Sequence, residues 1–230
     1  DNLTFLNDGK HFVWTSEKSG YNHIYLYNIK GKEVRKITKG NFDVTNFYGI
    51  DESDNTVYFA SAERSPLHRD IYSIKLNGKN KTILTNKVGT NSATFSTNYK
   101  YFINQYSNSN TPYYFSLFDK KGNEVRMLKD NATLNSNLSE YELSRKEFFN
   151  FTTTEGVNLN GWMMKPHNFD ETKKYPLFMY LYGGPGSQQV TDSWGGSNFL
   201  WYQMLTQHGY IVACIDNRGT GGRGSEFKKC

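Results

Sequence analysis

The stretch YPLFMYLYGGPGSQ (residues 175–188) decides the fold, because an apolar run stops at a tyrosine and four of the next five residues are glycine or proline. Such a continuous apolar run is typical of a strand buried on both faces. A second run, YIVACID, occupies residues 210–216. Apolar residues at 199–201, 204 and 205 predict a helix between them, capped by Asn198 and ended by Gly209. Strand, helix and strand in this order predict a parallel α/β sheet.

The sequence upstream of this α/β pattern predicts antiparallel strands. Residues 148–166 (FFNFTTTEGVNLNGWMMKP) predict a hairpin that turns at Glu155–Gly156. Before residue 147, three similar segments begin at His11, Thr56 and Lys100. Each has an aromatic strand, a polar loop, a second aromatic strand, a glycine turn and a third strand. Their spacing of about 45 residues is that of one β-propeller blade.

The turns support this repeat. Lys30–Gly31–Lys32, Asn77–Gly78–Lys79 and Lys121–Gly122–Asn123 each lie between two alternating strands, as hairpin turns do. Three blades are too few for a closed ring, which has typically four to eight. We therefore predict that residues 1–146 are the C-terminal part of a longer β-propeller and that residues 147–230 begin an α/β domain. An ordinary antiparallel sandwich is the alternative for the first part.

Composition limits the classes of partner. The net charge is +5, and the basic residues are mixed with acidic ones, which indicates a solvated surface and no nucleic-acid stripe. No apolar run approaches the roughly 18 residues of a membrane span. Neither Cys214 nor Cys230 lies in a CxxC motif or near a histidine pair, so we expect no metal site and no disulfide framework. Cys214 lies in an apolar strand and is predicted to be a buried thiol. We expect no cofactor.

Two motifs carry a family resemblance. Tyr182-Gly183-Gly184-Pro185-Gly186-Ser187-Gln188, followed later by Asp216-Asn217-Arg218-Gly219-Thr220-Gly221, resembles the prolyl oligopeptidase family of serine peptidases. GYNHI at residues 20–24 and KKYPL at residues 173–177 resemble its dipeptidyl peptidase IV branch, of the bacterial type. The resemblance covers nearly the whole chain. It implies that residues 1–146 are the last propeller blades and that residues 147–230 are the N-terminal part of an α/β-hydrolase catalytic domain.

The resemblance assigns a role to one residue. It implies that Tyr182 presents its phenol to the carbonyl oxygen of the scissile bond, where negative charge develops. One such donor contributes roughly 3 to 4 kcal/mol to catalysis. The alternative is that Tyr182 only packs and that the glycines only form a turn.

The resemblance also implies an activity. The complete enzyme would release dipeptides with Pro or Ala at the second position from peptides with a free N-terminus, by serine attack and histidine proton transfer. It would be a homodimer, in the periplasm, secreted or at the cell envelope. A Gly-x-Ser-x-Gly elbow, which carries the nucleophile in this fold, is absent from the 230 residues. The family's amine-binding glutamates are also missing, so we expect the chain alone to be inactive.

Three other interpretations stay open. Residues 219–224 (GTGGRG) match the dinucleotide motif Gly-x-Gly-x-x-Gly, but Asp216-Asn217-Arg218 separates them from the apolar residues of the strand. A tripeptidyl or acylaminoacyl peptidase of the same family is possible. A propeller that only binds partners is the non-enzymatic alternative, although such a platform has no need of an α/β portion.

Overall fold

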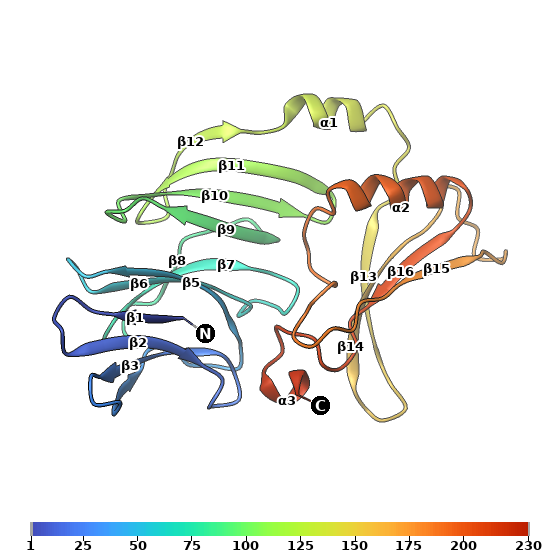
Figure 1. Cartoon of the computed structure of the whole chain (residues 1–230). Helices are drawn as coiled ribbons and strands as arrows, with labels where there is room; N and C mark the ends of the chain where they lie inside the picture. Colours follow the sequence, from blue (N-terminus) through green and yellow to red (C-terminus); the bar gives the residue numbers. More distant parts are fainter. Residues whose placement is uncertain (1, 230) are drawn as a thin grey trace.

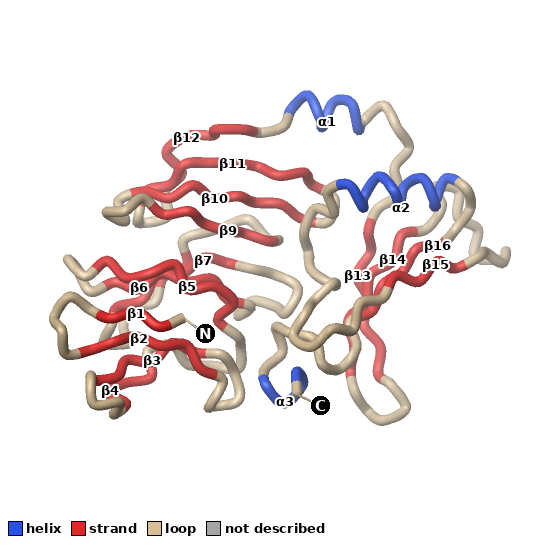
Figure 2. Tube along the Cα trace, viewed as in Figure 1, coloured by secondary structure: helices blue, strands red, loops and turns tan. Residues whose placement is uncertain are grey.

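The computed structural model describes residues 2–229, and its strands form four sheets of four strands each (Figures 1 and 2). Three sheets follow one another along the chain and are antiparallel, as in propeller blades. The fourth sheet is mixed and carries the helix α2. No helix within the described residues combines the length and apolarity that a membrane span needs.

The first three sheets use twelve strands in simple up-and-down order. The first sheet contains β1 (Leu3–Phe5), β2 (His11–Ser16), β3 (His23–Asn28) and β4 (Glu33–Lys36). The second contains β5 (Val44–Asp51), β6 (Thr56–Ser61), β7 (Asp70–Lys75) and β8 (Thr82–Ile83). The third contains β9 (Thr90–Phe95), β10 (Tyr101–Asn108), β11 (Thr111–Asp119) and β12 (Glu124–Lys129).

These sheets stack face to face, and the middle one is covered on both sides. All six residues of β6 are buried. Because successive side chains of a strand point to opposite faces, Val57 and Phe59 pack toward the first sheet while Tyr58 packs toward the third. Strand β6 thus contributes to two hydrophobic cores, one shared with the first sheet and one shared with the third.

The mixed sheet has the order β13-β14-β16-β15. It contains β13 (Lys146–Thr152), β14 (Asn158–Met164), β15 (Leu177–Tyr180) and β16 (Ile211–Ile215). Strands β15 and β16 are parallel, as the strand–helix–strand pattern predicts, and β13 and β14 form the predicted hairpin. Helices α1 (Ala132–Leu138), α2 (Ser197–Gln207) and α3 (Ser225–Lys228) complete the chain.

Three sequence predictions need correction. Each of the first three sheets has four strands, because β1, β5 and β9 precede the predicted segments. Strand β15 is not buried on both faces: it is the edge strand, and Leu177 is 56% exposed. Helix α2 begins at Ser197, with Gly196 at its cap in a conformation of positive φ (56°), so Asn198 lies inside the helix.

Candidate functional site

Tyr182 lies at the C-terminal end of the parallel strand pair. Strand β15 ends at Tyr180, two residues before it, and the chain then turns through the glycine-rich loop, residues 183–190. The Tyr182 side chain is 56% exposed. No group within residues 2–229 hydrogen-bonds its hydroxyl. The phenol is therefore free to donate a hydrogen bond to a molecule outside the protein.

The glycine-rich loop is fixed by its own backbone and by residues 219–221. The N–H and the hydroxyl of Ser187 both donate to the Gly184 carbonyl, at 3.1 and 2.8 Å. Gly186 takes a positive φ of 72° and donates to the Gly219 carbonyl at 2.8 Å. Gly221 donates to the Ser187 carbonyl at 3.0 Å, and a β-carbon on Gly221 would meet the Gly186 oxygen at 2.6 Å. Glycine is needed at 221 because the two loops touch there.

A buried carboxylate holds the far end of the loop. Asp216, directly after β16, is 4% exposed. Its Oδ1 accepts from the N–H of Gln189 at 2.8 Å and its Oδ2 from the N–H of Val190 at 3.0 Å. Burial raises the pKa of this carboxyl, against the two hydrogen bonds and the nearby Arg223, which lower it. Asp216 thereby ties the end of β16 to the loop that follows β15.

The antiparallel sheets contact the same two loops. Gln188 accepts a hydrogen bond from Arg69 and donates to the Pro66 carbonyl at 2.9 Å. Asp43 accepts from the N–H of Gly224 at 2.9 Å and from the N–H of Asn22 at 2.8 Å. These bonds form a seam between the first two sheets and the loops around Tyr182.

A cavity of about 290 Å³ lies along this seam. Burial lowers the pKa of the Arg69 guanidinium, and the charge of Asp43 opposes that shift. Tyr182 does not line the cavity, but Gly186 and Gln188 of its loop do. The lining comprises Glu17, Asn22, Asp43, Val44, Thr45, Arg69, Gly186, Gln188, Gly221, Gly222 and Lys228.

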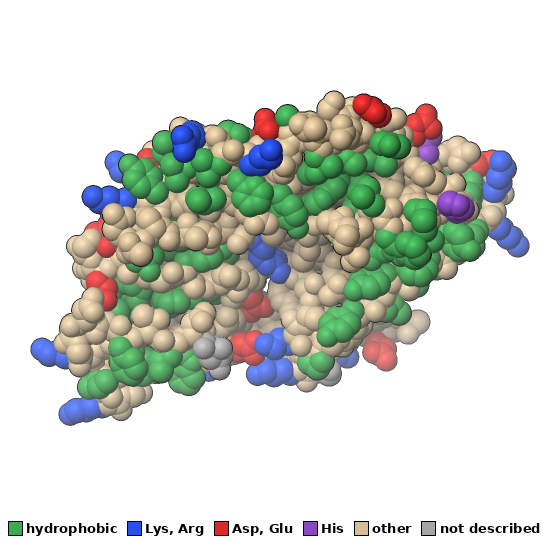
Figure 3. Space-filling model, turned by 45° about the horizontal axis from the view of Figure 1, so that its top comes forward, with side chains coloured by type: hydrophobic (Ala, Val, Ile, Leu, Met, Phe, Trp, Pro, Cys, Tyr) green, Lys and Arg blue, Asp and Glu red, His purple; other side chains and the backbone are tan. Residues whose placement is uncertain are grey.

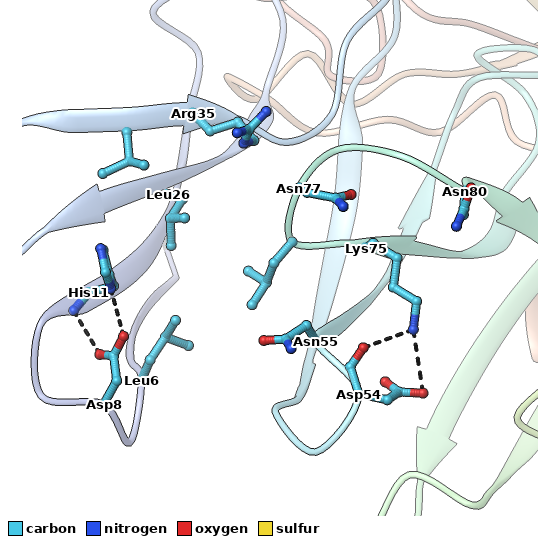
Figure 4. A pocket seen from close by; sticks show the side chains of 12 residues that line it. Leu6, Asp8, His11, Leu26, Arg35, Asp54, Asn55, Lys75, Asn77 and Asn80 are labelled. Carbon is cyan, nitrogen blue, oxygen red and sulfur yellow. Dashed lines mark hydrogen bonds and ion pairs between the residues drawn. The ribbon is translucent and has the colours of Figure 1, made fainter.

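A cavity of about 590 Å³ lies elsewhere, between the hairpins of the first two sheets (Figure 4). Its carboxylates are already paired, because His11 Nδ1 lies 2.6 Å from Asp8 Oδ2 and Lys75 Nζ lies 3.6 Å from Asp54 Oδ2. No residue of the mixed sheet lines it. Its size alone therefore does not make it a reaction site.

One surface of the mixed sheet is markedly apolar. Figure 3 shows hydrophobic side chains gathered over α2 and the β15 edge. They are exposed by 39 to 64% and comprise Leu177, Met179, Leu181, Leu200, Trp201 and Met204. Surfaces of this kind mark interaction sites in soluble proteins.

The remaining predicted residues have structural surroundings. Cys214 is buried and unpaired, as predicted, and Cys230 lies outside the described residues. Within residues 2–229, no cluster of three His, Cys, Asp or Glu side chains could hold a metal ion. The GTGGRG segment is followed by the four-residue α3, and its Gly224 packs against Tyr21. The seam residues Asp43 and Arg69 carried no sequence signal, because their partners across the seam, Gly224 and Gln188, lie more than a hundred residues away.

The comparisons with known proteins concern nearly the whole chain. Residues 1–113 match the model of the dipeptidyl peptidase IV (DPP IV) N-terminal region. The chain is 33% identical over 228 residues to dipeptidyl peptidase 4 of Arthroderma otae and to that of Trichophyton rubrum. These alignments cover 97% of the chain but 29% of each relative, so the chain spans less than a third of their length.

Solved structures give the same result. The crystal structure of Porphyromonas gingivalis dipeptidyl peptidase 4 is 47% identical, with a TM-score of 0.92 over 99% of this chain and 32% of the other. A putative dipeptidyl aminopeptidase IV from Bacteroides ovatus is 28% identical, with a TM-score of 0.85 over 99% of this chain and 35% of the other.

Proposed function

This chain belongs to the dipeptidyl peptidase IV branch of the prolyl oligopeptidase family, and we propose that it is part of a serine aminopeptidase that releases N-terminal dipeptides. The substrates are peptides with a free N-terminus and Pro or Ala at the second position. A serine attacks the scissile carbonyl, a histidine transfers the proton, and water hydrolyses the acyl-enzyme. The nucleophile and its partners come from the part of the enzyme outside these residues.

We assign different roles to the two parts of the chain. We assign residues 1–146, with their three stacked antiparallel sheets, to the last blades of a propeller that limits access to short or unfolded peptides. We assign residues 147–230 to the start of an α/β-hydrolase domain, because they form a mixed sheet with a parallel β15–β16 pair and a helix between. The exposed apolar residues of β15 and α2 are then the surface that the rest of the catalytic domain covers.

The single observation that carries the catalytic assignment is the unpartnered phenol of Tyr182. It stands at the C-terminal end of a parallel strand, the edge at which open α/β sheets bind their ligands. In the proposed reaction Tyr182 donates its proton in a hydrogen bond to the carbonyl oxygen as that oxygen becomes anionic. This bond is stronger to the tetrahedral intermediate than to the neutral substrate, so it lowers the barrier.

The test is the conversion of Tyr182 to Phe in the complete enzyme, assayed with Gly-Pro-p-nitroanilide. Loss of one oxyanion donor is expected to lower kcat by about 10²- to 10³-fold with little change in KM. Tyr210→Phe is the matched control, because it removes a hydroxyl from a partly exposed tyrosine before β16. An unchanged kcat in Tyr182→Phe would remove the oxyanion role.

The chain alone is expected to remain unlabelled by a fluorophosphonate probe, because it has no nucleophile elbow. Stoichiometric labelling would reveal an unrecognised nucleophile.

Two alternatives differ in observable ways. A related tripeptidyl or acylaminoacyl peptidase would cleave tripeptidyl or N-acylated substrates in preference to Gly-Pro-p-nitroanilide. A propeller that only binds partners would show no turnover of any of them. The homodimer that the family implies is tested by light scattering on the complete protein.

A further inference from the structure

The ring of Tyr182 lies against the backbone of Gly184. A β-carbon built on Gly184 would fall 2.9 Å from both Cε1 and Cζ of the ring and 3.0 Å from the phenolic oxygen. Non-bonded carbon atoms pack best at about 3.5 to 4.0 Å, so even a methyl group would displace the ring. Gly184 is half-buried while Gly183 and Pro185 on either side of it are exposed.

The backbone conformation does not explain the glycine at this position. Neither Gly183 nor Gly184 has a positive φ, unlike Gly186 in the same loop. A β-carbon on Gly183 would meet only the exposed amide of Asn217, at 3.1 Å, and that side chain can rotate away. Alanine at position 183 would therefore leave the Tyr182 ring in place, whereas alanine at position 184 would force the ring to move.

The surface beneath the ring is itself held in place. The Gly184 carbonyl accepts two hydrogen bonds from Ser187, through its N–H and its hydroxyl. The phenolic oxygen of Tyr182 has no partner within the described residues, so hydrogen bonding does not orient it. Contact with Gly184 blocks one of the directions that this exposed side chain can take.

We propose that Gly184 is a positioning residue: because it has no side chain, the Tyr182 ring packs against its Cα, and this contact directs the phenol toward the developing oxyanion. This inference rests on the proposed function of Tyr182. A donor contributes to catalysis in proportion to how well it is oriented before the reaction begins. Gly184 supplies that orientation without touching the substrate.

The test compares Gly184→Ala with Gly183→Ala in the complete enzyme, using Gly-Pro-p-nitroanilide. Displacement of the phenol by Gly184→Ala is expected to lower kcat about 10- to 100-fold. Gly183→Ala is expected to stay within about twofold of the wild type. Equal losses in the two variants would overturn the proposal, because the loop as a whole would then be responsible.

A double-mutant cycle separates positioning from general damage to the loop. In a Tyr182→Phe background, Gly184→Ala is expected to cause no further loss of kcat, because the hydroxyl it misdirects is already gone. The same loss in both backgrounds would refute the proposal. If Tyr182→Phe alone leaves kcat unchanged, the oxyanion role fails first, and this result is distinct from a failure of Gly184.

Folding provides an independent readout. If Gly184→Ala lowers the Tm of the enzyme, removal of the ring in Tyr182→Ala/Gly184→Ala is expected to restore it, since the clash needs both groups. Failure of the double variant to recover stability would place the strain elsewhere and overturn the proposal.

Discussion

Replacement of Asp216 by Ala tests how the loop after Tyr182 is held. The change removes the acceptor of the Gln189 and Val190 N–H groups. Val190 is 0% exposed and Gln189 is partly buried, so water replaces the carboxylate poorly. Each buried donor left unpaired costs about 1–3 kcal/mol, or about 2–6 kcal/mol for the pair. Removal of a carboxylate that burial disfavours offsets part of this cost, which leaves about 1–4 kcal/mol.

Hydrogen exchange measures this loss locally. At 1.4 kcal/mol for each factor of ten, amide protection across residues 186–190 is expected to fall about 5- to 700-fold in Asp216→Ala. Asp216→Asn keeps one acceptor and is expected to lose less. Asp170→Ala is the matched control, because the Asp170 carboxylate interacts only within its own turn, with Thr172 and Lys173. Protection within about threefold of the wild type in Asp216→Ala would show that the carboxylate does not hold the loop.

Two further predictions concern other groups. Burial, with a smaller effect of Asp216, raises the pKa of Cys214 to about 12. In a Cys230→Ser variant, iodoacetamide at pH 8 should therefore label this buried thiol only after denaturation. Rapid labelling of the native protein would contradict this. Burial raises the pKa of Glu17, but hydrogen bonds from Lys228 and Lys229 outweigh it and lower the pKa below 4.5. The folded state then binds this proton less tightly than the unfolded state, so the stabilisation is present above pH 4.5 and is lost as pH falls through the lowered pKa. Protection factors of the amides in residues 224–228, corrected for the intrinsic exchange rate at each pH, should therefore fall below pH 4.5 in the wild type. An equal fall in Glu17→Gln would exclude Glu17 as the cause.

The sequence predicted the repeats because their signals are local. Gly31, Gly78 and Gly122 have positive φ in the structure, as hairpin turns require, and they mark the same position in each of the three sheets. The first strand of each sheet was missed because its pattern is weak: β5 contains Gly49, and β9 (TNSATF) is mostly polar. Such strands form because a neighbouring strand pairs with them.

The apolar run before Tyr182 shows what local patterns cannot distinguish. Composition alone does not distinguish a central strand from an edge strand, because an edge strand can be equally apolar. The order β14-β16-β15 places β15 at the edge and leaves Leu177 and Met179 exposed. The sequence predicted the position of Tyr182 at the strand end, and its catalytic role stays a prediction. The support from Asp216 was not predicted, because its partners lie 26 and 27 residues away.

Helix α1, which connects β12 to β13, contains no buried residue, and its first turn has no side-chain cap. The segment that links the antiparallel stack to the mixed sheet therefore adds little packing between them, whereas the Asp43–Gly224 and Arg69–Gln188 hydrogen bonds join the two parts directly. A polypeptide nicked within residues 132–138 would then be expected to stay assembled. Two separately expressed halves, divided at that helix, could reassociate by complementation.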